Sequence, residues 1–325
     1  MKKIAILIPE TTLINVITDV EHFFEVINQI LINRNMDPVF TTELVGLNKV
    51  VKLNNGKYNV TVDSLLDEDK QYDIIFVTPL SGDMNEALIL NKAFIPWIIK
   101  QYENGAELVS LCLGSFFLAS TGLLNNKKCS SHWFLADKFR FSYPQVELVD
   151  NAIITEDQGI YSSGGASSYW NLLLHLAEKY TNRSVSILAS KFFAIDIGRE
   201  SQSAFSIFRG QKNHNDEIIK LAQEYIENNI DDRINVEVLA DRSLLGRRTF
   251  ERRFRKATNN SVLEYIHRVK IEAAKRSFEN TNKNINDVML DIGYTDGKAF
   301  RTMFKKNTGL TPIEYRNKYN KIVLW

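Results

Sequence analysis

The sequence predicts two domains of different fold class, an α/β sandwich followed by a smaller domain made only of helices. A chain of 325 residues is long for a single hydrophobic core. Up to about residue 190, short apolar runs alternate with amphipathic segments, which is the pattern of a parallel sheet covered by helices. From residue 216 onward the strand pattern is lost, and one amphipathic helix follows another.

Each element of the first domain follows from its own stretch of sequence. Strands are expected where apolar residues run without a break, and helices where apolar residues recur every three or four positions. Gly105 is the expected C-cap of the helix predicted at residues 92–104, because glycine commonly ends helices. The predicted strands or extended runs are KIAILI, DPVFTTELV, YDIIFVTPL, ELVSL and residues 160–163. The predicted helices cover residues 19–33, 92–104, 115–120 and 167–180.

The domain boundaries follow from the same change of pattern. Residues 1–193 are expected to form the α/β domain and residues 216–325 the helical domain, with residues 194–215 as a linker. The net charge of +1 is unevenly divided, since acids outnumber bases in residues 1–210 and bases outnumber acids in residues 211–325. The basic last third is therefore the candidate for binding nucleic acid.

The composition excludes several classes of protein. Hydrophobic residues make up 44% and charged residues 24%, as in ordinary globular proteins. No stretch is apolar for long enough to cross a membrane, and the first apolar run is too short for a signal peptide. Two cysteines argue against a disulfide framework, so a reducing cytoplasm is the expected compartment. The histidines and cysteines lack the spacing of metal ligands, and neither a metal nor a cofactor is expected.

The stretch VSLCLGSFFLAS joins an apolar strand to a helix, with Cys112 at the junction. Ser110 and Gly114 stand two positions to either side, and small residues are needed there because a strand that turns sharply into a helix crowds its own backbone. Many enzymes place a nucleophile at such a turn, and a following helix favours the thiolate. On this pattern alone, an inert buried cysteine and a reactive one both remain open. Cys129 lies in a polar segment and is expected to be exposed.

The region SLCLGSFFLASTGLLNNKKCSSHW, with YSSGGASSYWNLLLHLAEKY further on, resembles the DJ-1/PfpI, or class I glutamine amidotransferase-like, superfamily. It is most similar to the branch fused to AraC-type DNA-binding domains. The resemblance implies a flavodoxin-like α/β sandwich in which Cys112 is the elbow nucleophile and His132 lies near it. Two departures weaken catalysis. Leu113 replaces the histidine of the proteolytic members, and Asn15 stands where the related hydratases have an acid.

These departures indicate a site that binds a molecule without transforming it. A thiol without an acid–base partner is a poor catalyst. We therefore expect no catalytic residue, a degenerate elbow, and a pocket retained for a small molecule. The residues expected to bind that molecule are Glu10, Asn15, Cys112, Leu113 and His132.

The basic third contains a helix-turn-helix pattern. Residues 236–242 are predicted to form a short helix, SLLG a turn, and residues 247–257 a second helix that would lie in the major groove of DNA. A phenylalanine pair four positions apart should face the core. Arg248 and Arg252 have the same spacing on another face, where both could reach guanine edges. Seven basic residues against one acid between positions 242 and 256 supply positive charge for phosphates.

A second unit of the same kind follows. Helices are predicted at residues 285–292 and 296–307, with Asp296 as an N-cap and another phenylalanine pair on the second helix. Between the two units, residues 261–279 are predicted to form an amphipathic helix about 28 Å long, at 1.5 Å per residue. Successive faces of the major groove lie about 34 Å apart. A helix of that length could hold two recognition helices in adjacent grooves.

About 100 residues here closely resemble the AraC/XylS family DNA-binding domain, through the motifs LADRSLLGRRTFERRF and IGYTDGKAFRTMFKKNTGLTPIEYR. Gly246 stands where the family usually has the serine that opens the first recognition helix, and is a slightly weaker cap. Thr302 stands where the family usually has an arginine, so the second recognition helix is expected mainly to grip phosphate, with Lys298 as its better contact. The residues expected to contact DNA are Arg247, Arg248, Thr249, Arg252, Lys298, Arg301, Thr302, Lys305 and Lys306.

Together these features predict a sequence-specific transcription regulator and no enzyme. The resemblance implies a homodimer formed through the first domain. The other expected partners are promoter or operator DNA, a small and nitrogenous effector, and RNA polymerase, with no membrane. Two alternatives remain open. A cysteine-dependent hydrolase or hydratase of amide-like substrates, fused to a DNA-binding domain, would have a depressed Cys112 pKa. An architectural DNA binder would have a sealed pocket and would need no ligand.

Overall fold

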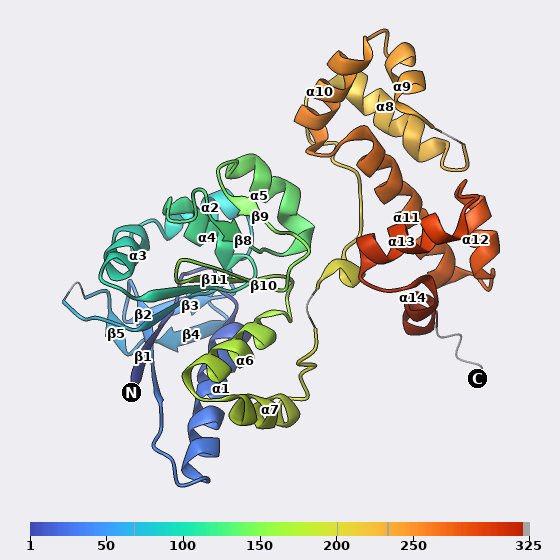
Figure 1. Cartoon of the computed structure of the whole chain (residues 1–325). Coiled ribbons are helices and arrows are strands. Elements are labelled where there is room, and N and C mark those ends of the chain that lie inside the picture. Colours follow the sequence, from blue (N-terminus) through green and yellow to red (C-terminus); the bar gives the residue numbers. More distant parts are fainter. Residues whose placement is uncertain (68, 200, 233, 321–325) are drawn as a thin grey trace. The chain divides into compact units, whose positions relative to one another are not determined.

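The computed structural model describes residues 1–67, 69–199, 201–232 and 234–320 (Figure 1). The chain divides into two compact units, Met1–Gln202 and Ser203–Trp325. The boundary lies inside the segment 194–215. The first residues of this segment therefore pack with the first unit, and its last residues pack with the second.

Within the described residues, the first unit is built on a seven-stranded sheet in the order β10-β11-β7-β6-β1-β2-β5. All neighbouring strands are parallel except β10 and β11. The strands are β1 (Lys2–Leu7), β2 (Phe40–Gly46), β5 (Ser64–Leu65), β6 (Ile74–Val77), β7 (Glu107–Ser110), β10 (Ile154–Asp157) and β11 (Ile160–Ser163). Two short pairs lie outside the sheet, β3 (Val50–Leu53) with β4 (Tyr58–Thr61) and β8 (Lys128–Cys129) with β9 (Glu147–Leu148).

Helices cover both faces of this sheet (Figure 1). In β1, Ile4 and Ile6 belong to one core and Ala5 and Leu7 to the other, because successive side chains of a strand point to opposite faces. The first core is closed by α1 (Ile14–Ile32), α6 (Tyr169–Tyr180) and α7 (Arg183–Phe192). The second is closed by α2 (Met84–Leu90), α3 (Phe94–Glu103), α4 (Gly114–Ser120) and α5 (Ala136–Ser142). The predicted flavodoxin-like α/β sandwich is confirmed.

Some details of the first unit differ from the sequence-based expectations. The helix expected from residue 19 begins at Ile14, and the run DPVFTTELV becomes a strand only at Phe40. The expectation that Cys129 is exposed was wrong, since its side chain is fully buried. The surrounding segment is polar, but β8 alternates, so that Lys128 faces solvent while Cys129 packs into the second core.

In the described residues of the second unit, all regular secondary structure is helical. The long helix α11 (Val262–Asn280) contributes residues to both small cores. The helices packed on its first half are α8 (Glu217–Asn228), α9 (Val236–Arg242) and α10 (Arg247–Thr258). Those on its second half are α12 (Ile285–Asp291), α13 (Gly297–Thr308) and α14 (Pro312–Tyr319), as Figure 1 shows. The predicted double helix-turn-helix architecture is confirmed, and its five predicted helices match the observed bounds to within one residue.

The two helix-turn-helix units repeat each other with a spacing of 50 residues. Thr258 and Thr308 are both buried, and each donates its hydroxyl to the carbonyl four residues earlier at 2.8 Å. The next residue of each unit has a left-handed φ, and Ser261 and Thr311 then open a helix with a capping box. Each position on α13 therefore has a counterpart on α10.

In the described part of the chain, no helix is both long and apolar enough to cross a membrane. No group of three or more His, Cys, Asp or Glu side chains in these residues has the arrangement of a metal site.

Candidate functional site

The chain turns sharply from β7 into α4 at Cys112. This residue has a φ of 54°, in the left-handed region that residues other than glycine seldom adopt. Only glycine fits at position 114, because a Cβ there would lie 2.3 Å from the carbonyl oxygen of Val77. The turn expected from the small-x-Cys-x-small pattern is present. It places Cys112 at the carboxyl edge of the sheet, where ligands of α/β proteins commonly bind.

The thiol of Cys112 lies in an uncharged environment. The residue is 8% exposed, and burial raises the pKa of its thiol to about 11, opposed only by a hydrogen bond from the Leu113 backbone N–H. No charged side chain contributes to this shift. The thiol is therefore protonated at neutral pH, and a protonated thiol is a weak nucleophile.

His132 helps to shape the loop beside the elbow. Its Nδ1 accepts a hydrogen bond from the Phe134 backbone N–H at 3.1 Å, so the imidazole caps the short 3₁₀ helix Trp133–Leu135. Burial lowers the pKa of His132, which keeps the ring neutral. Among the described residues, no hydrogen bond joins His132 to Cys112. The two residues expected to form the degenerate elbow are thus both neutral and not directly bonded.

Serine side chains tie the elbow to the neighbouring loops. The Cys112 backbone N–H donates to Ser163 Oγ at 3.1 Å. The Ser115 hydroxyl lies 2.7 Å from Ser131 Oγ and 3.0 Å from the Cys112 carbonyl oxygen. All of these serines are fully or almost fully buried. The floor of the site is therefore a fixed network of neutral hydroxyl groups.

Three further buried hydroxyl groups follow strands at this edge of the sheet. Thr11 and Thr12 lie in the loop after β1 and Ser168 in the loop after β11, and none of these hydroxyls has a hydrogen-bond partner among the described residues. The side chains of Thr12 and Ser168 are 4% and 0% exposed. An unsatisfied buried hydroxyl costs about 1–3 kcal/mol, so such groups favour a ligand or water that bonds to them. Neither Thr12 nor Ser168 was among the predicted site residues, although their positions just after apolar strands were a usable signal.

The other expected ligand residues follow β1 and β7 in the chain. Glu10 is exposed, and its backbone N–H donates to Asn91 Oδ1 at 3.0 Å. Asn15 is exposed in the first turn of α1, and Leu113 is half-buried beside Cys112. One turn after Asn15, Asp19 accepts a hydrogen bond from the Tyr169 hydroxyl. Asn15 thus carries no carboxylate, but Asp19 places one on the next turn of the helix, where Tyr169 is hydrogen-bonded to it.

The first recognition helix, α10, separates its core and outer faces as expected. Phe250 and Phe254 are fully buried. Arg248 and Arg252 are exposed and have no partner among the described residues. At about 100° per residue they lie close together on the outer face with Lys256. These three side chains form the outward stripe of α10.

Two other arginines of α10 are engaged within the fold. Arg247 contacts the carboxylates of Glu237 and Glu251, the latter at 3.2 Å. Arg253 donates two hydrogen bonds to Asp216, the N-cap of α8, at 2.9 and 2.7 Å, and these bonds lower the pKa of Asp216. The guanidinium groups of Arg247 and Arg253 are therefore engaged within the fold, in contrast to those of Arg248 and Arg252.

The second recognition helix, α13, presents a different outward stripe. Asp296 caps it as expected, accepting from the Lys298 backbone N–H at 2.8 Å. By the 50-residue repeat, Lys298, Thr302 and Lys306 correspond to the outward stripe of α10, and all three are exposed. Arg301 corresponds to Glu251 and lies to one side of the stripe. Lys305 and Thr249 flank the two stripes, Lys305 exposed and Thr249 half-buried.

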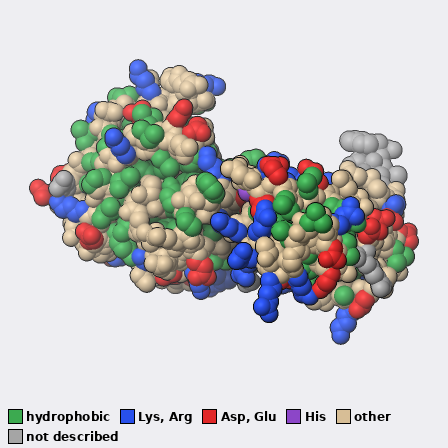
Figure 2. Space-filling view, turned by 90° about the horizontal axis from the view of Figure 1, so that it is seen from above, with side chains coloured by type: hydrophobic (Ala, Val, Ile, Leu, Met, Phe, Trp, Pro, Cys, Tyr) green, Lys and Arg blue, Asp and Glu red, His purple; other side chains and the backbone are tan. Residues whose placement is uncertain are grey.

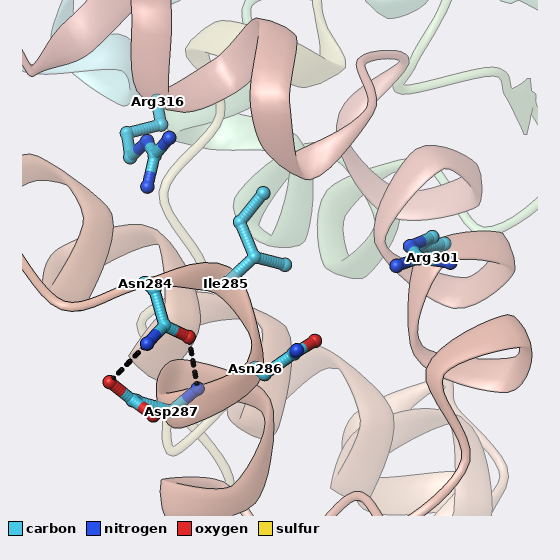
Figure 3. Close-up of a pocket in the computed structure, with 6 residues that line it drawn as sticks. All are labelled: Asn284, Ile285, Asn286, Asp287, Arg301 and Arg316. Carbon is cyan, nitrogen blue, oxygen red and sulfur yellow. Dashed lines mark hydrogen bonds between the residues drawn. The ribbon is translucent and has the colours of Figure 1, made fainter.

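A hollow of about 470 Å³ opens beside α13 (Figure 3). Arg301 from α13 and Arg316 from α14 lie on two sides of it, with Ile285 between them. Asn284 and Asp287, at the start of α12, are held together by hydrogen bonds of 2.7 and 3.0 Å. The two guanidinium groups can meet an anionic group at this hollow. Figure 2 shows further Lys and Arg side chains on the visible face of the helical unit.

Two family profiles match the chain. Residues 10–179, more than half of the chain, match the DJ-1/PfpI family. Residues 239–318 match a helix-turn-helix domain.

Curated relatives share both parts. The transcriptional regulator CdhR of Pseudomonas aeruginosa is 23% identical over 268 residues, which are 82% of this chain and 78% of CdhR. The transcriptional regulator GbdR of the same species is 23% identical over 258 residues, 79% of this chain and 69% of GbdR. Among solved structures, a candidate transcriptional regulator from Vibrio parahaemolyticus matches 59% of this chain and 98% of its own, with 22% identity and a TM-score of 0.52. At that identity the last comparison establishes the fold alone.

Proposed function

Since the chain belongs to the DJ-1/PfpI family and carries an AraC-type helix-turn-helix domain, we propose that it is a transcription regulator whose first unit binds a small effector and whose second unit reads DNA. Transcription regulation is the function of the relatives that share both units. Because a regulator acts on chromosomal DNA, the proposal includes a cytoplasmic location.

The observation that carries the DNA-binding role is the pair of helix-turn-helix units on α11. This helix has 19 residues and is about 28 Å long, close to the spacing of about 34 Å between successive major-groove faces. Arg248 and Arg252 project from the first recognition helix without an internal partner in the described residues. Arginine pairs with the O6 and N7 atoms of guanine, so we assign base reading to α10.

The second recognition helix is proposed to contribute mainly phosphate contacts. The centre of its outward stripe is Thr302, where α10 has Arg252. Lys298, Lys305 and Lys306 supply positive charge around it. Arg301, beside the hollow, is placed to hold a backbone phosphate.

The effector site is proposed at the carboxyl edge of the sheet, around Cys112 and His132. The unsatisfied hydroxyls of Thr12 and Ser168 favour a ligand with several hydrogen-bonding groups. Neutral thiol and imidazole groups favour binding over reaction. A small nitrogenous metabolite, with Glu10, Asn15 and Leu113 as further contacts, fits the resemblance. A homodimer formed through the first unit and a contact with RNA polymerase complete the proposal.

Two measurements test this function in the full chain. Selection of duplexes from a random library should yield a defined sequence, and no enrichment would refute sequence-specific reading. A thermal-melting screen against small amines, amides and amino acids should find a compound that raises the melting temperature and is recovered unchanged. If no compound does so, the effector role is wrong.

A cysteine-dependent hydrolase or hydratase is the second candidate, because the left-handed φ of Cys112 keeps the strained elbow of an enzyme. It requires that a compound from the same screen be recovered with a changed mass. It also requires that Cys112→Ser abolish this conversion.

A further inference from the structure

We propose that Gln202 is a positioning residue that couples the elbow site to the DNA-binding unit, an inference that rests on the proposed function. Gln202 is the last residue of the first unit, and Ser203 opens the second. The Gln202 side chain is fully buried. Full burial is unusual for glutamine, because a buried amide costs free energy unless its donors and acceptor are all hydrogen-bonded.

The amide of Gln202 holds separate loops together. Its Oε1 accepts a hydrogen bond from the Gly165 backbone N–H at 2.7 Å. Its Nε2 donates to the carbonyl oxygens of Asp150 at 2.8 Å and Ser131 at 2.9 Å, with the Ala152 carbonyl oxygen at 3.2 Å. Only a primary amide offers two donor hydrogens and an acceptor in this arrangement, so an acidic or aliphatic side chain cannot replace it.

The glycine pair after β11 makes room for this side chain. A Cβ on Gly164 would lie 2.7 Å from Gln202 Nε2, and a Cβ on Gly165 would lie 3.1 Å from Gln202 Oε1. Neither glycine has a positive φ. Space for the amide, and not an unusual backbone conformation, therefore explains both glycines.

The loops that hold Gln202 are the loops that build the elbow. Ser131, which accepts from Gln202 through its carbonyl, is bonded through its hydroxyl to Ser115 and is followed directly by His132. Ser163, which accepts from the Cys112 backbone N–H, stands two residues before Gly165. A ligand that shifts either loop must therefore shift or break a hydrogen bond of Gln202.

On its other side, the chain is anchored to the long helix α11 and to α14. The Ala204 carbonyl oxygen accepts from the Tyr319 hydroxyl at 3.0 Å. The Phe208 backbone N–H donates to Glu272 Oε2 at 3.1 Å, and Glu272 forms a buried ion pair of 2.7 Å with Lys275. From Gln202 to Ala204 the chain can span only about 7 Å. The path along the chain from Gln202 to the first anchored residue of the second unit is therefore short.

Backbone hydrogen–deuterium exchange in the full chain tests this coupling without a natural effector. Ser115→Ala perturbs the elbow, Gln202→Ala removes the proposed link, and the Phe208 amide of the second unit is the readout. We expect the Phe208 amide to exchange about threefold faster in Ser115→Ala and about tenfold faster in Gln202→Ala. The double variant should match Gln202→Ala alone, because coupled sites are not additive.

Gln101→Ala is the matched control. Gln101 is also a fully buried glutamine, with its amide bonded to the Tyr72 backbone N–H at 3.2 Å and the Lys70 carbonyl oxygen at 2.6 Å. This variant loses a comparable set of bonds elsewhere in the first unit, so it should leave the Phe208 amide unchanged. An equal acceleration in Gln101→Ala, or additive effects in the double variant, would overturn the coupling.

Gln202→Glu gives a second route if the alanine variant does not fold. It keeps the acceptor for Gly165 but loses the donors, so it should also accelerate exchange at Phe208. If the exchange experiments show coupling but the melting screen finds no stabilising metabolite, the proposed effector-binding role is wrong and the positioning role of Gln202 stands.

Discussion

Replacing Arg252 by alanine tests how the protein reads DNA. Arg252 projects from the outward stripe of α10 and has no partner among the described residues, so its guanidinium is free to bond a base. Loss of one bidentate base contact costs about 1–3 kcal/mol, which corresponds to about 5- to 150-fold weaker binding of the selected sequence. On random DNA the variant loses only the electrostatic attraction between one positive charge and the phosphates, so the affinity for random DNA should fall much less.

Arg247→Ala and Lys305→Ala are the controls for this experiment. Arg247 lies on the same helix with the same charge, but Glu237 and Glu251 hold its guanidinium, so we expect a smaller loss. Lys305→Ala should weaken all sequences alike and lower the salt slope by about one. Fluorescence anisotropy with selected and scrambled duplexes at several salt concentrations measures these effects. Equal weakening of both duplexes by Arg252→Ala would refute base reading by this residue.

The remaining predictions concern the first unit and the internal repeat. In a Cys129→Ser background, thiolate absorbance should titrate Cys112 with a midpoint pKa of about 11, and a midpoint below about 8 would favour the enzyme. Because this pKa is raised from 9.0, the stability that the buried thiol contributes should be complete below about pH 9 and lost as the pH rises toward 11. Gly114→Ala should destabilise the first unit by about 3 kcal/mol in urea unfolding, since its Cβ would meet a carbonyl oxygen at 2.3 Å, and an unchanged midpoint would contradict the elbow geometry. Tyr315→Phe removes one hydrogen bond to a carboxylate and should cost the second unit about 1.5–3 kcal/mol, whereas Tyr265→Phe removes the bond to Glu227 and also the bond from Gln223, so it should cost more, and a smaller loss in Tyr265→Phe would contradict these contacts.

The helical unit could be predicted closely because its signals are local. Helix starts depend on caps such as Asp296, and helix faces depend on spacing such as that of Phe250 and Phe254. These features act within a few residues of the chain. Short elements such as α5 and α7 were not anticipated, because their formation depends on packing against a sheet that the local sequence does not specify.

The sequence by itself determined the two fold classes, the elbow at Cys112 and the outward arginines of α10, since each follows from periodicity or from residues a few positions apart. The tertiary structure alone decided which groups are free and which are engaged. Arg253 donates to Asp216, the N-cap of a helix 37 residues earlier in the chain, and the partners of Gln202 lie 37 to 71 residues away. The raised pKa of Cys112 likewise comes from burial by distant segments. Burial and hydrogen bonding between such segments exist only once the chain has folded, so no local pattern could report them.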